Sequence, residues 1–507
     1  MPRIAPTPAT ALPYPARALT PAHADLPRSA GVPARLANER YVEAMARIVY
    51  YWGYPAVDSF GRTNMWEIMK DGPGAMLGIL PGAPMNTTGY LADYMSPAQR
   101  WVVTPNSDTF YGAGFANLAV EPAVIQTPVD APPGHYWTIQ ITDVFTNVIH
   151  QLGSASRTPG GKYLLVGPEW NGELPEGFLG ILLSPTNVAA AFPRSFAPHT
   201  PEGKERARAV LGQIGMYPLS EDRPGQRTID IEKLARNAVF PPGVTAEAIA
   251  ADPDAARPQW VKPETFWDDL KKMLDANPRV GADDAVMADQ ARVLIALRAN
   301  PQYRELLDRV ALAADADLHA SGTYVQVGVD AGNGWQRQEG AGVWKDDWFS
   351  RAQASVIYIY VNDYREATYL VRGTDSGGAL LEGTYAYTMT FAKDALPPVD
   401  RERGGFWSLT MYDKDYFMLP NAPNGRTNLG TVSIDANELR FAGDGSLTLH
   451  LSHAEPSAEE ERANWLPAPE GQFALIIRAY VPGQSILDGG YRFPDVIRVE
   501  ANGAAKR

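Results

Sequence analysis

Short apolar segments broken by proline and glycine are the feature that most constrains the fold of this chain. Between about residues 101 and 196, runs of strand length alternate with breakers such as Ala131-Pro-Pro-Gly134 and Thr158-Pro-Gly-Gly161. The same pattern returns from Ser321 to the end of the chain. Short strands at regular spacing are typical of antiparallel sandwiches and jelly-rolls. We therefore predict a mainly β fold with helical insertions: two antiparallel β-sandwich or jelly-roll-like domains joined by a helical layer.

The order of these patterns predicts four parts. The first part is so rich in proline and alanine that we expect an extended or disordered arm. Apolar residues at helical spacing predict the connector between the two β regions. The expected parts are the arm, the N-terminal helices with the first sandwich, the helical connector and the C-terminal sandwich, at residues 1–37, 38–200, 201–320 and 321–507.

Composition excludes several functional classes. The 507 residues include no cysteine, which excludes disulfides, thiolate nucleophiles and cysteine-ligated metals. A net charge of -13 argues against nucleic acid or an anionic membrane as partner. No apolar run reaches the length of a membrane span. We expect a soluble protein, cytoplasmic as written or periplasmic if a signal has been removed. An arm draped over a neighbouring subunit would make it a homo-oligomer.

A polar corner follows the start of the first β region. Pro105 is expected to force Thr104 into an extended conformation, and Asn106, Ser107 and Asp108 are residues that form tight turns with their own backbone. One interpretation is a rigid corner that presents Asn106 and Asp108 to a pocket. The other is an ordinary Asx turn between two strands.

The strand-like segment after His135 has one polar face. Alternation places Tyr136 and Gln140 on that face, which either meets solvent or lines a pocket. Asp143 and Asn147 follow, where this strand ends and the chain turns.

Two arginines lie within otherwise apolar strand segments, Arg194 and Arg478. A buried guanidinium needs carboxylate or carbonyl partners. Each arginine is therefore either half of a structural ion pair or the anchor for an anionic or carbonyl-bearing ligand.

Two further segments of the C-terminal region combine polar and aromatic residues. In the segment from Phe406 to Asp413, alternation separates Trp407 from Tyr412. Asn464 and Trp465 begin a second proline-bounded corner. We count Trp407, Asn464 and Trp465 among the candidate binding residues.

Known catalytic signatures are missing from the sequence. It contains no Walker loop, no G-x-S-x-G elbow and no H-E-x-x-H helix. We predict no cofactor. A divalent metal is not excluded, since His150 or His199 could combine with carboxylates distant in sequence.

Long motifs in both halves resemble two domain-of-unknown-function families, 1254 in the N-terminal half and 1214 in the C-terminal half. The resemblance rests on Trp52-Gly-Tyr-Pro55, Thr104-Pro-Asn-Ser-Asp-Thr-Phe-Tyr111, Gln140-Ile-Thr-Asp-Val-Phe-Thr-Asn147, Gly405-Phe-Trp-Ser-Leu-Thr-Met-Tyr-Asp413 and Asn464-Trp-Leu-Pro467. It covers nearly everything from about residue 40 onward and implies two sandwiches with helical elements. It also implies that export is common, and it implies no reaction.

The leading functional hypothesis is an enzyme acting on a small or amphiphilic organic substrate in a cleft. Hydrolase or lyase chemistry would use Asp108 or Asp143 as general base, with Tyr111, Tyr136 or Tyr412 as acid. Arg194 or Arg478 would orient a carboxylate or stabilise developing negative charge. The alternatives are a non-catalytic ligand-binding or envelope-associated protein and, third, a metalloenzyme that uses histidine and carboxylate ligands.

Overall fold

The computed structural model describes residues 36, 38–63, 83–91, 93–95, 103–229, 259–321, 327–419 and 422–499. The predicted arm, residues 1–37, lies outside the described residues except for Leu36. Trp101 and Val102, the start of the strand-like run before the polar corner, also lie outside them.

The N-terminal β region consists of two sheets packed face to face. The larger sheet has the order β1(Thr87–Leu91), β2(Thr109–Asn117), β8(Val188–Phe196), β4(Trp137–Asp143), β5(Val148–Gly153). The smaller sheet has the order β7(Phe178–Leu183), β6(Gly161–Val166), β3(Ala123–Thr127), β9(Gly215–Pro218). Trp137, Ile139 and Ile141 point into the core between the sheets, as alternation predicts. Helix α3(Pro201–Leu211) packs on the same core.

The C-terminal β region repeats this plan. Its larger sheet has the order β10(Val329–Gly332), β11(Trp335–Arg337), β12(Ala367–Arg372), β18(Phe473–Tyr480), β14(Phe406–Asp413), β15(Asn428–Gly430). Its smaller sheet has the order β17(Trp465–Pro467), β16(Leu447–Ser452), β13(Tyr387–Phe391), β19(Ile497–Arg498). Leucine, isoleucine and aromatic side chains from both sheets fill the space between them. Short helices border the region: α10(Thr431–Asp435), α11(Glu459–Ala463) and α12(Gln484–Leu487).

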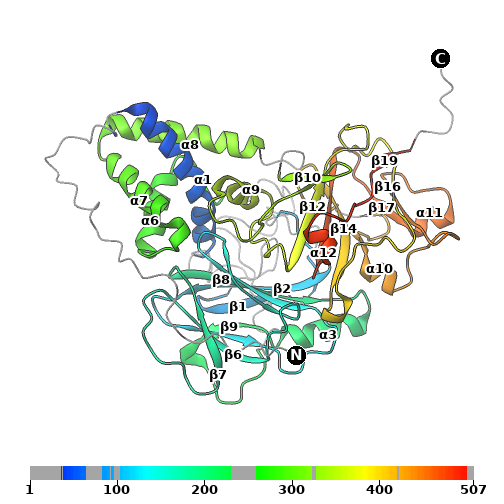
Figure 1. Cartoon of the computed structure of the whole chain (residues 1–507), viewed down its shortest axis with the longest axis horizontal. Coiled ribbons are helices and arrows are strands. Elements are labelled where there is room, and N and C mark those ends of the chain that lie inside the picture. The colour runs from blue at the N-terminus through cyan, green and yellow to red at the C-terminus, as the bar shows by residue number, and fades with distance from the viewer. Residues whose placement is uncertain are drawn as a thin grey trace, which may run out of the picture.

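Five helices form one apolar layer beside the two sandwiches (Figure 1). They are α1(Glu39–Thr63), α6(Phe266–Ala276), α7(Ala282–Leu297), α8(Pro301–Ser321) and α9(Trp348–Ile357). Buried residues of all five belong to one core that includes Trp52 and Trp267. The layer therefore combines α1 from the N-terminal part and α9 from the C-terminal part with α6, α7 and α8 of the connector.

The architecture confirms a mainly β fold with helical insertions. The strand pairs are antiparallel except β6 with β7 and β16 with β17, which are parallel, so two of the described sheets are mixed. None of the described helices is long and apolar enough to cross a membrane.

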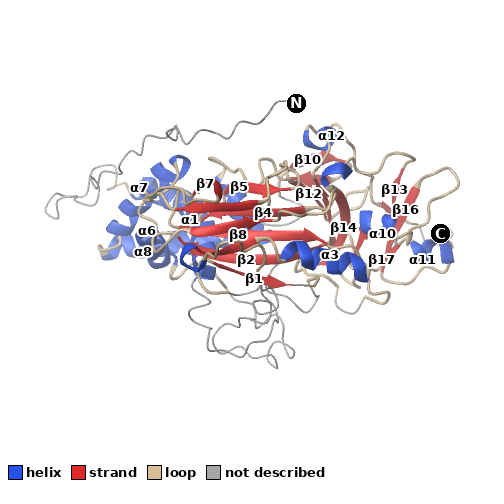
Figure 2. Ribbon diagram, turned by 90° about the horizontal axis from the view of Figure 1, so that it is seen from below, coloured by secondary structure: helices blue, strands red, loops and turns tan. Residues whose placement is uncertain are grey.

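The larger sheets of the two sandwiches lie close together in the middle of the elongated molecule (Figure 2). On β4, the residues opposite the apolar core face include Thr138 and Gln140, and both are fully buried. On β14, Ser408 and Thr410 are likewise buried, while Trp407 and Leu409 point into the C-terminal core. Polar faces of two sheets therefore meet between the domains.

Candidate functional site

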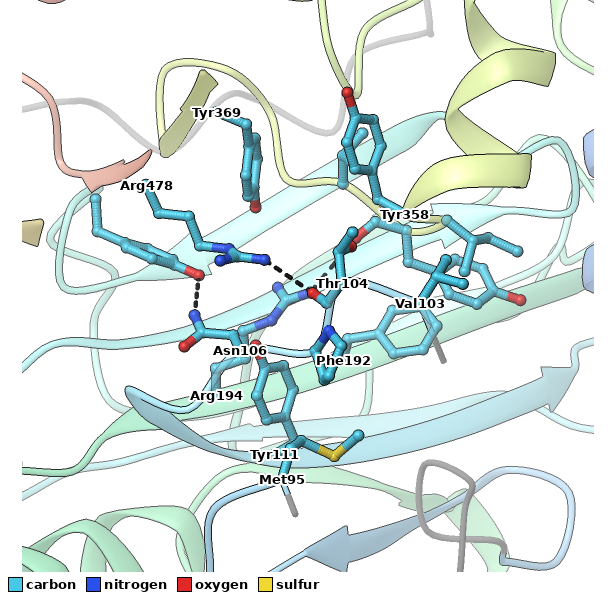
Figure 3. A pocket seen from close by; sticks show the side chains of 15 residues that line it. Met95, Val103, Thr104, Asn106, Tyr111, Phe192, Arg194, Tyr358, Tyr369 and Arg478 are labelled. Atoms are coloured by element: carbon cyan, nitrogen blue, oxygen red, sulfur yellow. Dashed lines mark hydrogen bonds between the residues drawn. The ribbon is translucent and has the colours of Figure 1, made fainter. Parts of the chain in front are cut away.

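A small cavity of about 70 Å³ lies between the two sandwiches, and we call it the arginine cavity (Figure 3). Its wall combines strand residues from both larger sheets with two loops. The lining residues are Met95, Val103, Thr104, Pro105, Asn106, Tyr111, Phe192, Arg194, Tyr358, Ile359, Tyr360, Val361, Tyr369, Arg478 and Tyr480.

Strand register places an arginine on an inner strand of each facing sheet. Arg194 of β8 lies opposite Tyr111 of β2 on one side and Thr138 of β4 on the other. Arg478 of β18 lies between Tyr369 of β12 and Ser408 of β14. Both arginines thus come from rigid, fully paired strands, which is the arrangement that positions a side chain best.

Arg194 is 6% exposed and makes neutral contacts. Its Nη1 donates to Asn362 Oδ1 at 2.6 Å, and its Nη2 donates to Gln140 Oε1 at 2.9 Å. Its Nε is buried without a hydrogen-bond partner among the described residues. The guanidinium carbon lies 5.4 Å from the ring centre of Tyr111.

Arg478 is 3% exposed and also makes neutral contacts. Its Nη2 donates to the Thr104 carbonyl at 2.8 Å, and its Nη1 donates to Thr410 Oγ1 at 3.1 Å. Within the described part of the chain, no carboxylate lies within 4.0 Å of the Arg194 or Arg478 guanidinium. Because neither guanidinium bonds an acid of the described residues, both keep positive potential at the cavity.

The polar corner forms one edge of this cavity. Asn106 Oδ1 accepts from the Asp108 amide at 2.6 Å, which makes an Asx turn, and Asn106 Nδ2 donates to Tyr480 Oη at 2.6 Å. Asn106 therefore shapes the turn and lines the cavity.

The expectation of an extended Thr104 is wrong, because its φ is 52°, in the left-handed region. Tertiary hydrogen bonds overcome the local preference imposed by the proline. The Thr104 amide donates to the Tyr416 carbonyl at 2.8 Å, and the Thr104 carbonyl accepts from Arg478.

A second loop of the cavity wall also contains strained residues. Ile359 and Tyr360 have φ values of 34° and 52°. A positive φ at a β-branched residue such as Thr104 or Ile359 is a genuine outlier. Strain of this kind gathers at ligand clamps and active sites, where the surrounding structure holds it in place.

Asp108 and Tyr412 lie behind the corner and are not lining residues. Asp108 accepts from Ser408 Oγ at 2.6 Å and from Asn428 Nδ2 at 2.7 Å, and burial raises the pKa of its carboxyl. Tyr412 donates to the Pro105 carbonyl at 2.6 Å, and burial raises the pKa of its hydroxyl to about 12. Both side chains brace the corner from the C-terminal sheet.

Asp143 and Asn147 belong to a different buried group, which we call the Asp–Arg cluster: Asp143, Asn147, Asp284 and Arg351. Asn147 donates its amide and its Nδ2 to Asp143, each at 2.9 Å. Arg351 donates to Asp284 Oδ1 at 2.9 Å and to Asn147 Oδ1 at 3.2 Å. Burial and the neighbouring Asp284 carboxylate raise the pKa of Asp143 to about 7. The cluster ties the β4–β5 turn to α7 and α9.

Three other predicted binding residues lie away from the cavity. Trp407 packs in the C-terminal core, with its ring centre 5.1 Å from that of Phe391. Asn464 bonds the backbone of Arg440 and Thr448, and Trp465 Nε1 donates to the Ser452 carbonyl at 2.9 Å. The polar atoms of Asn464 and Trp465 therefore bond backbone groups of the C-terminal region.

Sequence reasoning missed several residues around the arginines. Tyr480 could have been found, because it lies two residues after Arg478 on the same strand and so faces the same way. Tyr369 and Asn362 carried no comparable sequence signal. In the structure, Asn362 Nδ2 donates to Tyr369 Oη at 2.8 Å. Glu366 was also missed. It accepts from Tyr136 Oη at 2.8 Å, and burial raises its pKa to about 7.

The structure offers little for a metal ion. No three histidine, aspartate or glutamate side chains in the described ranges lie in a group that could hold a metal. His150 Nε2 lies 3.0 Å from the Leu183 carbonyl, and the ring of His199 packs edge-on against Tyr94, with centres 5.5 Å apart.

Comparison with solved structures found proteins that align with most of this chain. A crystal structure of the VPA0106 protein from Vibrio parahaemolyticus has 20% sequence identity and a TM-score of 0.60, over 90% of this chain and 100% of that chain. That likeness supports the fold. A putative uncharacterized protein from Burkholderia cenocepacia has 11% identity and a TM-score of 0.41, over 92% of this chain and 96% of that chain. No match is found among curated proteins.

Two family models match separate segments of the chain. Both are described as proteins of unknown function, and each segment coincides with most of one sandwich. The protein thus combines a domain of the DUF1254 family, at residues 85–218, with a domain of the DUF1214 family, at residues 366–484.

Proposed function

We propose that the protein binds a small anionic organic ligand in the arginine cavity. The observation that carries this proposal is that Arg194 and Arg478, each more than nine-tenths buried, line one cavity without a carboxylate bonded to either of them among the described residues. Arginine is well suited to this role, since its planar fork matches the geometry of carboxylates and similar anions.

Pre-organisation supports the same reading. Gln140 holds Arg194 on one side and donates its own amide to the Val361 carbonyl at 2.5 Å. Thr410 and the Thr104 carbonyl hold Arg478. Side chains fixed before the ligand arrives lose little entropy on binding, which favours affinity.

Thermal unfolding and calorimetry with a panel of small carboxylates, sulfate and phosphate test the proposal. We expect at least one anion to bind wild-type protein and raise its melting temperature. Arg194→Gln and Arg478→Gln should each weaken that binding at least tenfold, because each removes a charged donor. Arg372→Gln is the matched control and should leave anion binding unchanged. Arg372 is a buried arginine of the sheet that contains Arg478, and it pairs with Asp495 away from the cavity. Failure of every anion to bind, or equal binding by all three variants, would refute the proposal.

Hydrolase or lyase chemistry on the bound ligand is the second candidate. It is favoured by Tyr111, which lines the cavity beside Arg194. Burial raises the pKa of the Tyr111 hydroxyl although Arg194 opposes this, so the group stays protonated at neutral pH and is able to donate. Turnover of ester or lactone substrates by wild type and its loss in Tyr111→Phe would support catalysis. Unchanged turnover in Tyr111→Phe would remove Tyr111 from this role.

A further inference from the structure

The arginine cavity has two chemically different ends. In Figure 3, Arg478, Arg194 and Asn106 are gathered at one side, while Phe192 and Val103 lie at the other. A ligand that fits both ends must carry a charged group and an apolar body.

The apolar end is a packed wall. Phe192 is 1% exposed, and its ring centre lies 4.2 Å from that of Tyr360. Ile359 belongs to the same apolar cluster and is 7% exposed. Contact with these side chains would remove apolar ligand surface from water, which is favourable in proportion to the area buried.

The volume limits the ligand to a small molecule. The cavity of about 70 Å³ suits a short-chain or single-ring acid better than a lipid or a peptide.

The arrangement of groups in the cavity indicates a monoanion. Both guanidiniums lie at one end, and the other end is lined by apolar side chains. A second charged group on the ligand would be buried at the apolar end without a partner, which is costly.

We propose that the cavity takes a small amphiphilic monocarboxylate. Its carboxylate lies between Arg194 and Arg478, and its apolar body packs against Phe192 and Ile359. This inference rests on the proposed anion-binding function.

Titration calorimetry of the full chain with acetate, butyrate, benzoate, succinate and phosphate tests the ligand class. Butyrate should bind at least tenfold more tightly than acetate, since each buried methylene contributes about fourfold in affinity. Succinate, which has the same chain length as butyrate, should bind at least tenfold more weakly than butyrate because its second carboxylate meets the apolar wall. Phosphate should also bind more weakly than butyrate.

Variants of the apolar wall test the orientation. Phe192→Trp fills the apolar end and should weaken benzoate binding at least tenfold while changing acetate binding less than threefold. Val103→Leu enlarges a second residue of the apolar end by one methylene, and it serves the same purpose if Phe192→Trp does not fold. Equal losses for acetate and benzoate in a folded variant would overturn the orientation.

The outcomes distinguish a failure of the monocarboxylate inference from a failure of the proposed anion binding. Binding of succinate or phosphate as tight as that of butyrate would overturn the monocarboxylate class and leave anion binding intact. Absence of binding by all five probes would overturn both.

Discussion

The Asp–Arg cluster and the arginine cavity both bury charged side chains between elements distant in sequence, but only in the cluster does an arginine bond a carboxylate of the described residues directly. Arg351 is 0% exposed and bonds Asp284, which also accepts from Trp52 Nε1 at 2.8 Å. Arg194 and Arg478 are buried almost as completely, yet they donate to neutral groups.

This difference suggests that the Asp–Arg cluster serves stability and the arginine cavity serves binding. In the cluster, Arg351 bonds Asp284 directly, and Asn147 links both residues to Asp143. These bonds connect α1, α7, α9 and the β4–β5 turn. At the cavity, no bonded acid offsets the cost of burying two cations. A bound anion would supply the missing electrostatic attraction, which favours binding. The same residue type therefore holds domains together in one place and attracts a ligand in the other.

Replacement of the central arginine of each group should give the largest contrast. Arg351→Met leaves Asp284 buried without its cation and should lower the free energy of unfolding by about 3–5 kcal/mol. Arg194→Met removes a cation that has no bonded acid and should cost less than half as much, about 1–2 kcal/mol for the acceptors left unpaired. Urea denaturation of both variants and wild type measures the difference.

A matched variant sharpens this test. Arg351→Lys keeps the positive charge but loses the second donor direction, so its stability should fall between those of wild type and Arg351→Met. Equal destabilisation by Arg351→Met and Arg194→Met would mean that both arginines are structural, and the contrast between the two groups would be lost.

The sequence predicted the arginines of the cavity better than it predicted the acids of either group. A charged residue inside an apolar strand, such as Arg194 or Arg478, is recognisable because the strand pattern itself implies burial. Alternation likewise separated Trp137 and Ile139 from Gln140. Turn signals and short strands predicted the face-to-face sheets, but not the two parallel strand pairs.

The rest depends on contacts between distant segments. The bonded partner of Arg351 is Asp284, 67 residues away, and Asn428 meets Asp108 across 320 residues. Neither pairing has a local pattern. The conformation of Thr104 also reversed its local preference, because its carbonyl accepts from a guanidinium 374 residues later.

The raised pKa of Asp143 should make stability fall as pH rises. Its folded pKa of about 7 lies above the ordinary value of 3.8, so the folded state keeps a proton that the unfolded state releases between these values. The stabilisation is full below about pH 4 and is lost as pH rises through 7, by up to about 1.4 kcal/mol per pH unit. Denaturant unfolding between pH 4 and 8 should give a flatter profile for Asp143→Asn than for wild type.

The contrast between wild type and Asp143→Asn decides the assignment of the pH profile. A profile of Asp143→Asn as steep as that of wild type would assign the pH dependence to other groups and would contradict a proton on Asp143.

Glu366 should give the corresponding pH effect on binding. Its carboxyl is contacted by Tyr136 and Thr138 and is influenced by Arg194 and Asp363. Below pH 7 the protonated carboxyl leaves Arg194 uncompensated, so benzoate should bind about three- to tenfold more tightly at pH 6 than at pH 8. Calorimetry with Glu366→Gln should show the low-pH affinity throughout, and an unchanged pH dependence in this variant would exclude Glu366 as the cause.

The smallest effect is expected at Tyr412, which hydrogen-bonds the polar corner and does not line the cavity. Tyr412→Phe loses the hydrogen bond to the Pro105 carbonyl and should lower the free energy of unfolding by about 1 kcal/mol. Anion affinity should stay within twofold of wild type, since Tyr412 does not line the cavity. Tyr111→Phe is the paired variant on the cavity wall and should alter affinity more than stability. If Tyr412→Phe instead weakened binding as much as Arg478→Gln, the corner would have to move with the ligand, and its bracing by Tyr412 would be part of the binding site.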